Sequence, residues 1–267
     1  MINTDTFLKI GDSHRVCEDY IVSGNIPVPF IILADGCSSS NDTEMGARIL
    51  CHLAKQYIRY RGDDLYNLDY FKMGSWVIHN AELSARQLGL KVTCLDATLI
   101  VSYELDDTVY VYMYGDGAVV AKEERGSIHV DSIKFTNNAP YYLSYLIDES
   151  RDDIYHENKN SKSLNMACED GSADFKELAY DAKIILKYNL SAHPNIFICS
   201  DGIESFVKKD PSQRDILTPL EVLPDMMAFK TTKGEFLKRR LKRALKNLND
   251  DGIVHYDDLS IGAYTRL

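Results

Sequence analysis

The chain alternates short apolar runs with polar turns, and two of the apolar runs end in the same way. Residues 31–34, Ile-Ile-Leu-Ala, lead into Asp35-Gly36, and residues 195–199, Asn-Ile-Phe-Ile-Cys, lead through a serine into Asp201-Gly202. Apolar runs of this length that stop at a turn signal are typical of buried strands. Each run therefore predicts a strand that carries a carboxylate at its end, beside a glycine where the main chain can pass close to a ligand.

Alternating and short apolar runs predict further strands along the whole chain. In residues 108–114, for example, valines and a methionine alternate with three tyrosines, which gives one aliphatic and one aromatic face. The strand over residues 181–190 is expected to pair with the next one, at residues 195–200. The complete set of predicted strands covers residues 1–12, 20–22, 31–34, 97–103, 108–114, 118–122, 128–135, 181–190, 195–200 and 257–264.

Apolar residues at helical spacing predict four helices. A helix after residue 43 and a helix over residues 68–88 would each bury an apolar stripe, formed by Met45, Ile49, Leu53 and Tyr57 in the first and by Phe71, Ile78, Ala81, Ala85 and Leu88 in the second. Two more helices are predicted over residues 220–229 and 234–248. The last would bury Leu237, Leu241, Leu245 and Leu248. The rest of its surface is basic. This pattern favours a face that is simply solvated, and a face that binds an anion or a partner is the alternative.

The segment 148–174 is polar and charged and has few apolar anchors, so it predicts a flap or an insertion. One hypothesis is that this flap faces the substrate. The sequence shows no internal repeat, low-complexity tract or clear linker elsewhere. Residues 1–267 are therefore expected to form one domain.

Composition and charge narrow the class of protein. A hydrophobic content of 45% and a charged content of 26% are typical of a soluble globular chain. The net charge of −10 makes nucleic acid a poor partner, because phosphate binding needs a basic face. No apolar run reaches the roughly 20 residues of a membrane span, and the start of the chain is unlike a signal peptide. Six cysteines without a C-x-x-C pair indicate reduced thiols, so a cytoplasmic location is expected.

Acidic residues stand at several of the predicted strand ends. Any one of them alone is most often a turn residue or a helix cap. Together they would repel one another unless a cation or protons compensated their charge. Mg²⁺ and Mn²⁺ prefer oxygen ligands, whereas the chain has no zinc-type spacing of His and Cys. A pair of such cations suits phosphoryl chemistry. The acids concerned are Glu18, Asp19, Asp35, Asp201, Asp257 and Asp258.

The order of these motifs resembles the PPM/PP2C family of metal-dependent protein serine/threonine phosphatases, and most of all its divergent bacterial branch. Each motif is short and weak by itself, but the set is ordered as in the family and spans almost the whole chain. The matching stretches are Cys17-Glu18-Asp19, Ala34-Asp35-Gly36, Ala97-Thr98-Leu99, Gly115-Asp116-Gly117 with Ser200-Asp201-Gly202, and Asp257-Asp258-Leu259-Ser260.

This resemblance implies an α+β fold, a four-layer α-β-β-α sandwich with two central antiparallel β-sheets. It also implies a site for two Mn²⁺ or Mg²⁺ ions, with room for a third. Asp35 would bridge both ions, and the carbonyl of Gly36 would bind one of them. The other ion would be held by Asp201 and by Asp257, which is assigned in preference to its neighbour Asp258. Glu18 and Asp19 would hold water molecules bound to the ion that Gly36 contacts. No residue near the Ala97 strand is identified for a third ion, although Asp96 stands there.

Two positions depart from the family pattern. His14 stands where the family usually has a phosphate-binding arginine, with Arg15 beside it. His14 could contact the phosphate, or it could only orient Glu18 or Asp19. Cys37 follows the Asp-Gly motif and is either a thiol open to oxidation near the metal or a packed inert one.

The resemblance implies hydrolysis of phosphoserine and phosphothreonine on proteins by a metal-bridging hydroxide, without a phosphoenzyme. Asp35, Asp19 and His14 are the expected catalytic residues. The expected partners are a phosphorylated protein in a signalling system and a cognate serine/threonine kinase. Two alternatives stay open: a catalytically weak or inactive relative that binds a phosphorylated partner, and a phosphatase of small phosphorylated metabolites.

Overall fold

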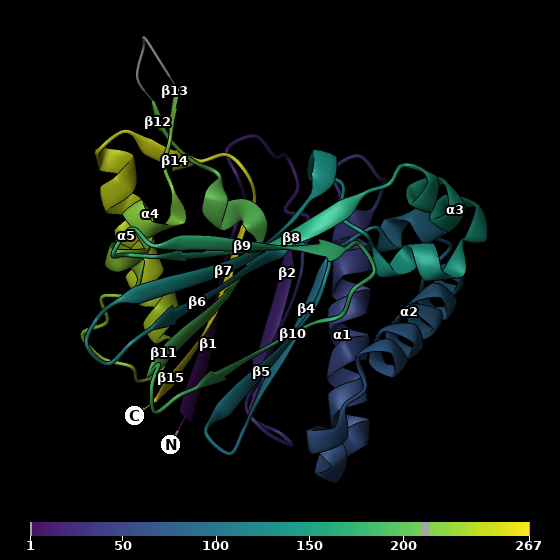
Figure 1. Ribbon diagram of the computed structural model, residues 1–267, viewed down its shortest axis with the longest axis horizontal. Coiled ribbons are helices and arrows are strands. Elements are labelled where there is room, and N and C mark those ends of the chain that lie inside the picture. The colour runs from purple at the N-terminus through teal and green to yellow at the C-terminus, as the bar shows by residue number, and fades with distance from the viewer. Residues whose placement is uncertain (1, 210–213, 267) are drawn as a thin grey trace.

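The computed structural model describes residues 2–209 and 214–266, and these residues form four layers (Figure 1). Two antiparallel sheets, of seven and five strands, lie face to face in the middle. Helices cover the outer face of each sheet. The α-β-β-α sandwich that the family resemblance implies is therefore confirmed.

The larger sheet begins at the edge strand β1 and ends with a hairpin at its other edge. Its strand order is β1 (Ile2–Lys9), β15 (Leu259–Arg266), β11 (Asn195–Cys199), β6 (Gly117–Lys122), β7 (Ile128–Phe135), β8 (Ser161–Cys168) and β9 (Ala173–Ala179). The order of the smaller sheet is β10 (Ile184–Asn189), β5 (Thr108–Tyr114), β4 (Leu99–Leu105), β3 (Phe30–Ala34) and β2 (Tyr20–Gly24). A third, short sheet contains β13 (Arg214–Ile216), β12 (Phe206–Lys209) and β14 (Ile253–His255).

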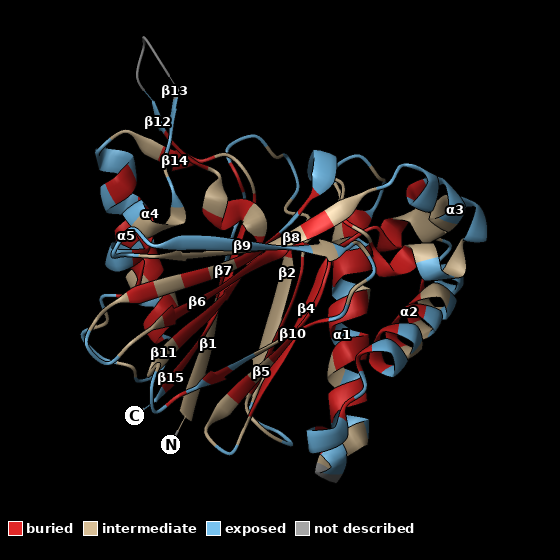
Figure 2. Cartoon of the chain, viewed as in Figure 1, coloured by how far each residue is buried: buried red, intermediate tan, exposed pale blue. Residues whose placement is uncertain are grey.

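Three apolar clusters hold the layers together, and Figure 2 shows the central strands and the inner sides of the helices as buried. Between the sheets, aliphatic residues of β3 and β5 pack against those of β11. The aliphatic face predicted for residues 108–114 points into this layer. The tyrosines Tyr112 and Tyr114 on the other face of β5 pack beneath the helices, so both faces of the strand are buried.

Two pairs of helices form the outer layers. On the smaller sheet lie α1 (Thr43–Arg61) and α2 (Tyr70–Gln87), and on the larger sheet lie α4 (Pro219–Met226) and α5 (Phe236–Asp250). The predicted leucine stripe of α5 is buried, as expected. The shorter α3 (Glu149–Glu157) follows 3₁₀ turns at η3 (Thr136–Asn138) and η4 (Leu143–Ile147), and other 3₁₀ turns are η1 (Gly62–Asn67), η2 (Val92–Leu95) and η5 (Asp201–Glu204). None of the described helices is long and apolar enough to cross a membrane.

The predicted buried stripes of α1 and α2 were partly wrong. In α2, Ile78, Ala81 and Ala85 are buried, but Phe71 and Leu88 have exposed fractions of 61% and 60%. In α1, Leu53 and Tyr57 are buried as predicted, whereas Met45 is exposed. The buried face of α1 also contains Ala47, Leu50, Cys51, Ala54 and Ile58. Neighbouring stripes on one helix both satisfy a period of 3.6 residues, so packing against the sheet decides which of them is buried.

The predicted pairing of residues 181–190 with residues 195–200 was also wrong. Strand β10 pairs with β5 in the smaller sheet, whereas β11 lies between β15 and β6 in the larger one. The backbone N–H of Leu190 donates to the carbonyl of Asp107 at 2.8 Å, which holds the end of β10 against the β4–β5 turn. The short connection therefore carries the chain from one sheet to the other instead of closing a hairpin.

The segment 148–174 contains α3, β8 and the start of β9. Strand β8 pairs with β7 from Lys162 opposite Phe135 to Cys168 opposite His129, so this half of the segment belongs to the larger sheet. Helix α3 packs against η4, which in turn contacts α2, and Figure 1 shows α3 away from α4 and α5. The flap hypothesis stays a prediction, and it now concerns α3 alone.

Candidate active site

Strand ends from both sheets bring four aspartates to one cavity of about 220 Å³. Asp35 directly follows β3 in the smaller sheet, and Asp201 begins η5 just after β11 in the larger one. Asp116 lies in the turn between β5 and β6, and Asp257 lies two residues before β15. Because β3 and β11 face each other across the sandwich, their acidic ends meet at the same end of it.

Hydrogen bonds fix the backbone that carries Asp35. The backbone N–H of Thr98 donates to the Asp35 carbonyl at 2.8 Å, and the Thr98 hydroxyl accepts from the Asp35 N–H at 3.3 Å. A side chain at Gly36 would place its Cβ 2.8 Å from the Cβ of Thr43 and 3.0 Å from the carbonyl of Glu18. The Ala97-Thr98 and Asp-Gly motifs therefore form one structural unit, and the second position of the Asp-Gly motif must be glycine.

Glu18 and Asp19 approach the cluster from the loop before β2. Asp19 is buried, and its Oδ2 accepts a hydrogen bond from the Ser200 hydroxyl at 2.9 Å. The Thr43 hydroxyl donates to Glu18 Oε1 at 3.1 Å. Ser200, which follows β11, thus orients Asp19, and Thr43, at the start of α1, orients Glu18.

The acids of the cluster are poorly compensated. Burial raises the pKa of Asp35 well above its usual range, and the charges of Asp19 and Asp201 raise it further. Burial also raises the pKa of Asp201, and it raises that of Asp19 to about 7. Two buried oxygens, Asp19 Oδ1 and Asp201 Oδ1, have no hydrogen-bond partner among the residues that the structure describes. Carboxylates in this state need protons or cations.

The donor set fits hard divalent cations. In the parts of the chain that the structure describes, no three His, Cys, Asp or Glu side chains are already closed into a metal-ligand set. The cavity nevertheless presents several carboxylates. One of their oxygens, Asp201 Oδ1, accepts no hydrogen bond from the described residues. Oxygen donors of this kind are what Mg²⁺ and Mn²⁺ bind.

The neighbouring acids Asp257 and Asp258 have different environments. Asp257 lines the cavity and its side chain is 42% exposed. The Asp258 side chain is 2% exposed, and its two oxygens accept from the backbone N–H groups of Gly11 at 2.8 Å and Glu18 at 2.6 Å. Asp258 therefore holds the loop before β2, whereas Asp257 faces the cavity.

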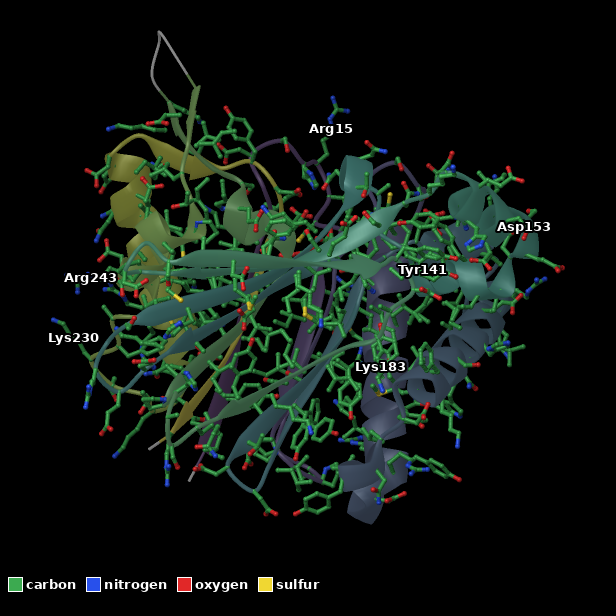
Figure 3. All side chains as sticks on the ribbon, in the orientation of Figure 1. Arg15, Tyr141, Asp153, Lys183, Lys230 and Arg243 are labelled. Atoms are coloured by element: carbon green, nitrogen blue, oxygen red, sulfur yellow. The ribbon has the colours of Figure 1, made fainter. Side chains whose placement is uncertain are left out.

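His14 is enclosed by carboxylates and also lines the cavity. Its Nε2 lies 3.2 Å from Asp257 Oδ1, and its Nδ1 lies 3.2 Å from Asp258 Oδ2 and 3.7 Å from Glu18 Oε2. The two shorter contacts connect His14 to Asp257 and Asp258, the longer one is to Glu18, and none of the three is to Asp19. The predicted contact with the phosphate stays a prediction. Arg15 is exposed and points away from the molecule (Figure 3).

The sequence analysis did not assign a role to Asp116. This side chain is 8% exposed, lines the cavity, and has a pKa raised well above its usual value by burial and by the charge of Asp201. The signal was present, because the Gly115-Asp116-Gly117 motif repeats the pattern of an apolar strand that ends in Asp and Gly.

Asp96 and Cys37 lie in the wall of the site and not among the acids. Asp96 is buried and accepts hydrogen bonds from the Ser40 and Ser144 hydroxyls and from Arg151 of α3. The Cys37 N–H donates to the Asp96 carbonyl at 2.8 Å. Asp96 therefore connects the loop after Asp35 to η4 and α3, and it is more than a turn acid.

A second cavity, of about 270 Å³, adjoins the first and shares Asp116, Asp201 and Asp257 with it. It is also lined by Lys134 of β7, whose ammonium group lies 2.5 Å from Glu204 Oε2. The Lys134 side chain is 54% exposed and lines this cavity, with its ammonium group paired to Glu204. Of the described residues that line the two cavities, Lys134 is the one lysine or arginine.

The fold and the cavity define a class of four-layer sandwich proteins with a carboxylate-lined cavity at one end of the sheets. A family model described as protein phosphatase 2C matches residues 10–246. The chain therefore belongs to the protein phosphatase 2C family, as the motif resemblance implied.

Solved structures agree on the fold. A bacterial serine phosphatase is 12% identical with a TM-score of 0.58, and the match covers 99% of this chain and 98% of that one. The serine/threonine phosphatase Stp1 from Staphylococcus aureus is 13% identical with a TM-score of 0.56, covering 100% and 96%. The catalytic domain of the phosphatase PstP, solved with two manganese ions, is 15% identical with a TM-score of 0.52, covering 99% and 97%. No curated protein sequence matches the chain.

Proposed function

We propose that this protein is a phosphatase that hydrolyses phosphoserine and phosphothreonine on proteins in the cytoplasm and depends on two divalent cations. The observation that carries the proposal is the convergence of Asp35, Asp116, Asp201 and Asp257 on one cavity, with Asp19 buried beside it. Membership of the protein phosphatase 2C family supports the same reaction class. The physiological partner would be a phosphorylated protein and, with it, the kinase that phosphorylates it.

In this proposal the residues of the cavity have distinct roles. Asp35 would contact both cations, Asp201 and Asp257 would complete the shell of one, and the Gly36 carbonyl with Glu18 and Asp19 would serve the other. Asp116 would help to hold a third ion. The bound cations would supply Lewis-acid activation of water and of the phosphate group. Asp258, Thr98 and Ser200 would keep the acidic loops in place through the hydrogen bonds described above.

Lys134 is the side chain that we expect to orient the phosphate group. It faces the cavity shared with Asp201 and Asp257, and a cation there offsets the charge of a substrate anion that approaches an acidic site. Lys134→Ala is expected to raise KM for an aryl phosphate about tenfold and to change kcat less. The matched control is Lys208→Ala, an exposed lysine that lines neither cavity. Equal KM values for wild type and Lys134→Ala would contradict this role.

Hydrolysis of a small aryl phosphate tests the proposed function directly. Wild-type protein is expected to turn over the substrate with added Mn²⁺ and to stop when a chelator is added. Phosphoserine and phosphothreonine peptides should then be hydrolysed in preference to small phosphorylated metabolites. A covalent phosphoenzyme trapped by acid quenching would contradict direct attack by water. No turnover by folded, Mn²⁺-loaded protein would instead favour an inactive relative that binds a phosphorylated partner.

A further inference from the structure

A separate cavity of about 220 Å³ lies along the solvent side of α5, on the outer layer that covers the larger sheet. We call it the α5 groove. It lies between the first half of α5 and the loop that joins α4 to α5. Figure 3 labels Lys230 and Arg243, which point outward on the same edge of the molecule. The groove is lined by Ala228, Phe229, Lys230, Thr231, Phe236, Arg239, Arg240 and Arg243.

The charge of the groove is opposite to that of the protein. Helix α5 contains six basic residues and one acidic residue, although the whole chain has a net charge of −10. Every charged side chain that lines the groove is a cation. Basic residues alone would also be expected on a helix face that is simply solvated. In the α5 groove, however, the loop over residues 228–231 forms a second wall opposite the helix. The basic residues therefore border a concave surface with aromatic rings in it.

Two of the four cations are held within the protein and two are not. Arg239 donates to the carbonyl of Lys233 at 2.7 Å, and Arg240 pairs with Asp225 at 3.3 Å. The side chains of Lys230 and Arg243 form no ion pair or hydrogen bond with the residues that the structure describes. The fixed arginines shape the groove, and the two unpaired cations at its rim are available to an anionic partner.

The walls of the groove are anchored to the sheet. The rings of Phe229 and Phe236 meet edge to face with centroids 5.1 Å apart, and Phe229 also packs on Phe197 of β11. The carboxylate of Asp5 in β1 accepts from the N–H groups of Leu237 and Lys238 at 2.8 and 3.1 Å, which caps α5. The groove is thus preformed, so a ligand would not have to order it.

We propose that the α5 groove binds an acidic segment of a partner protein. Carboxylates of the segment pair with Lys230 and Arg243, and an apolar side chain packs on the partly exposed ring of Phe229. The mixture of cations and aromatic surface favours a peptide over a simple inorganic anion, which would use the charges alone. The groove is lined by none of the residues of the acidic cavities, so the proposal does not depend on phosphatase activity.

Fluorescence anisotropy with a labelled synthetic peptide tests the proposal. The probe is a short run of Glu and Asp with Leu-Phe at its centre, and it is added to the full-length protein in chelator. We expect saturable binding with a Kd of about 10–100 µM at low salt. The double variant Lys230→Glu/Arg243→Glu should weaken binding at least about tenfold. The matched control, Lys242→Glu/Lys246→Glu, makes the same charge change on α5, outside the groove, and should change Kd less than about threefold.

Several outcomes would overturn the proposal. An equal loss of peptide affinity in the two double variants would show that binding is general electrostatic attraction. Absence of saturable binding to the wild type would show that the peptide has no site on the protein. Tighter binding of a single-stranded oligonucleotide or of anionic lipid vesicles would assign the groove to another class of partner. A dimer in sedimentation that the Lys230→Glu/Arg243→Glu variant dissociates would assign it to a second copy of this chain. Repeating the titration with Asp35→Asn separates this proposal from the proposed function, because that variant should bind the peptide normally.

Discussion

Asp35→Asn is expected to lower metal-dependent hydrolysis of an aryl phosphate by at least about 10³-fold. Asp35 stands at the centre of the acid cluster, where the charges of Asp19 and Asp201 both act on it. The amide has nearly the same shape but no negative charge, so it would be a poor ligand for two cations at once. Initial rates with Mn²⁺ titrated to saturation measure the effect. Asp153→Asn, which neutralises an exposed acid on α3, is the control (Figure 3).

The same substitution should stabilise the protein when metal is absent. The raised pKa of Asp35 means that its ionised form is disfavoured in the folded chain relative to the unfolded one. Stability associated with this group is complete below the ordinary carboxylate pKa of about 4 and is lost as pH rises through the raised value. Metal-free wild type should therefore melt several degrees lower at pH 8 than at pH 5.5. Asp35→Asn should melt higher than wild type at pH 8, and its melting temperature should depend less on pH.

Added Mn²⁺ gives the complementary result. It should raise the melting temperature of wild type at pH 8, because bound cations compensate the charges that otherwise repel. It should raise that of Asp35→Asn much less. Loss of activity without the gain in metal-free stability would mean that Asp35 is not held in an uncompensated acidic cluster. Retained activity in Asp35→Asn would contradict the central role of Asp35.

Local patterns in the sequence predicted much of the fold, and the errors have physical causes. The leucine stripe of α5 was predicted correctly, because six cations mark the opposite face of that helix. The stripe of α2 was less well defined, because Phe71 and Leu88 have the right spacing yet lie beside the buried face. The partner of β10 could not be predicted from the next strand in sequence, because the chain passes from an edge strand of the smaller sheet to an internal strand of the larger one. The layer arrangement itself came from the family resemblance.

The site was predicted unevenly for a similar reason. Motifs of a strand followed by Asp and Gly identified Asp35 and Asp201, and the structure brings both to one cavity. Asp116 has the same local pattern, and its motif counted toward the family resemblance, but no role in the site was predicted for it. The role of Asp96 depends on Ser144 and Arg151, which are about 50 residues away in the sequence, so no local pattern could show it. Lys134 likewise becomes notable only when the cavity is known.

Substitutions at the adjacent acids Asp257 and Asp258 are expected to differ in their effect on stability. Asp257→Asn should reduce Mn²⁺-dependent turnover by about 10²–10³-fold, while its melting temperature in chelator stays within about 2 °C of wild type. Its Oδ1 accepts from the Asp258 N–H at 2.8 Å, and an asparagine oxygen can accept the same bond. What the variant loses is one negative charge at an exposed position in the cavity.

Asp258→Ala should instead lower the free energy of unfolding by about 2–5 kcal/mol. The substitution removes the two carboxylate oxygens that accept from the N–H groups of Gly11 and Glu18. Because the Asp258 side chain is only 2% exposed, both N–H groups are left without a partner in a buried place. Each kcal/mol corresponds to roughly 2–4 °C in melting temperature for a protein of this size. Activity should also fall, because the loop that carries Glu18 and Asp19 loses its anchor. Thermal unfolding in chelator and Mn²⁺-dependent rates, measured on both variants, distinguish the two roles. A stable but inactive Asp258→Ala, together with an active Asp257→Asn, would exchange the assignments and make Asp258 the ligand.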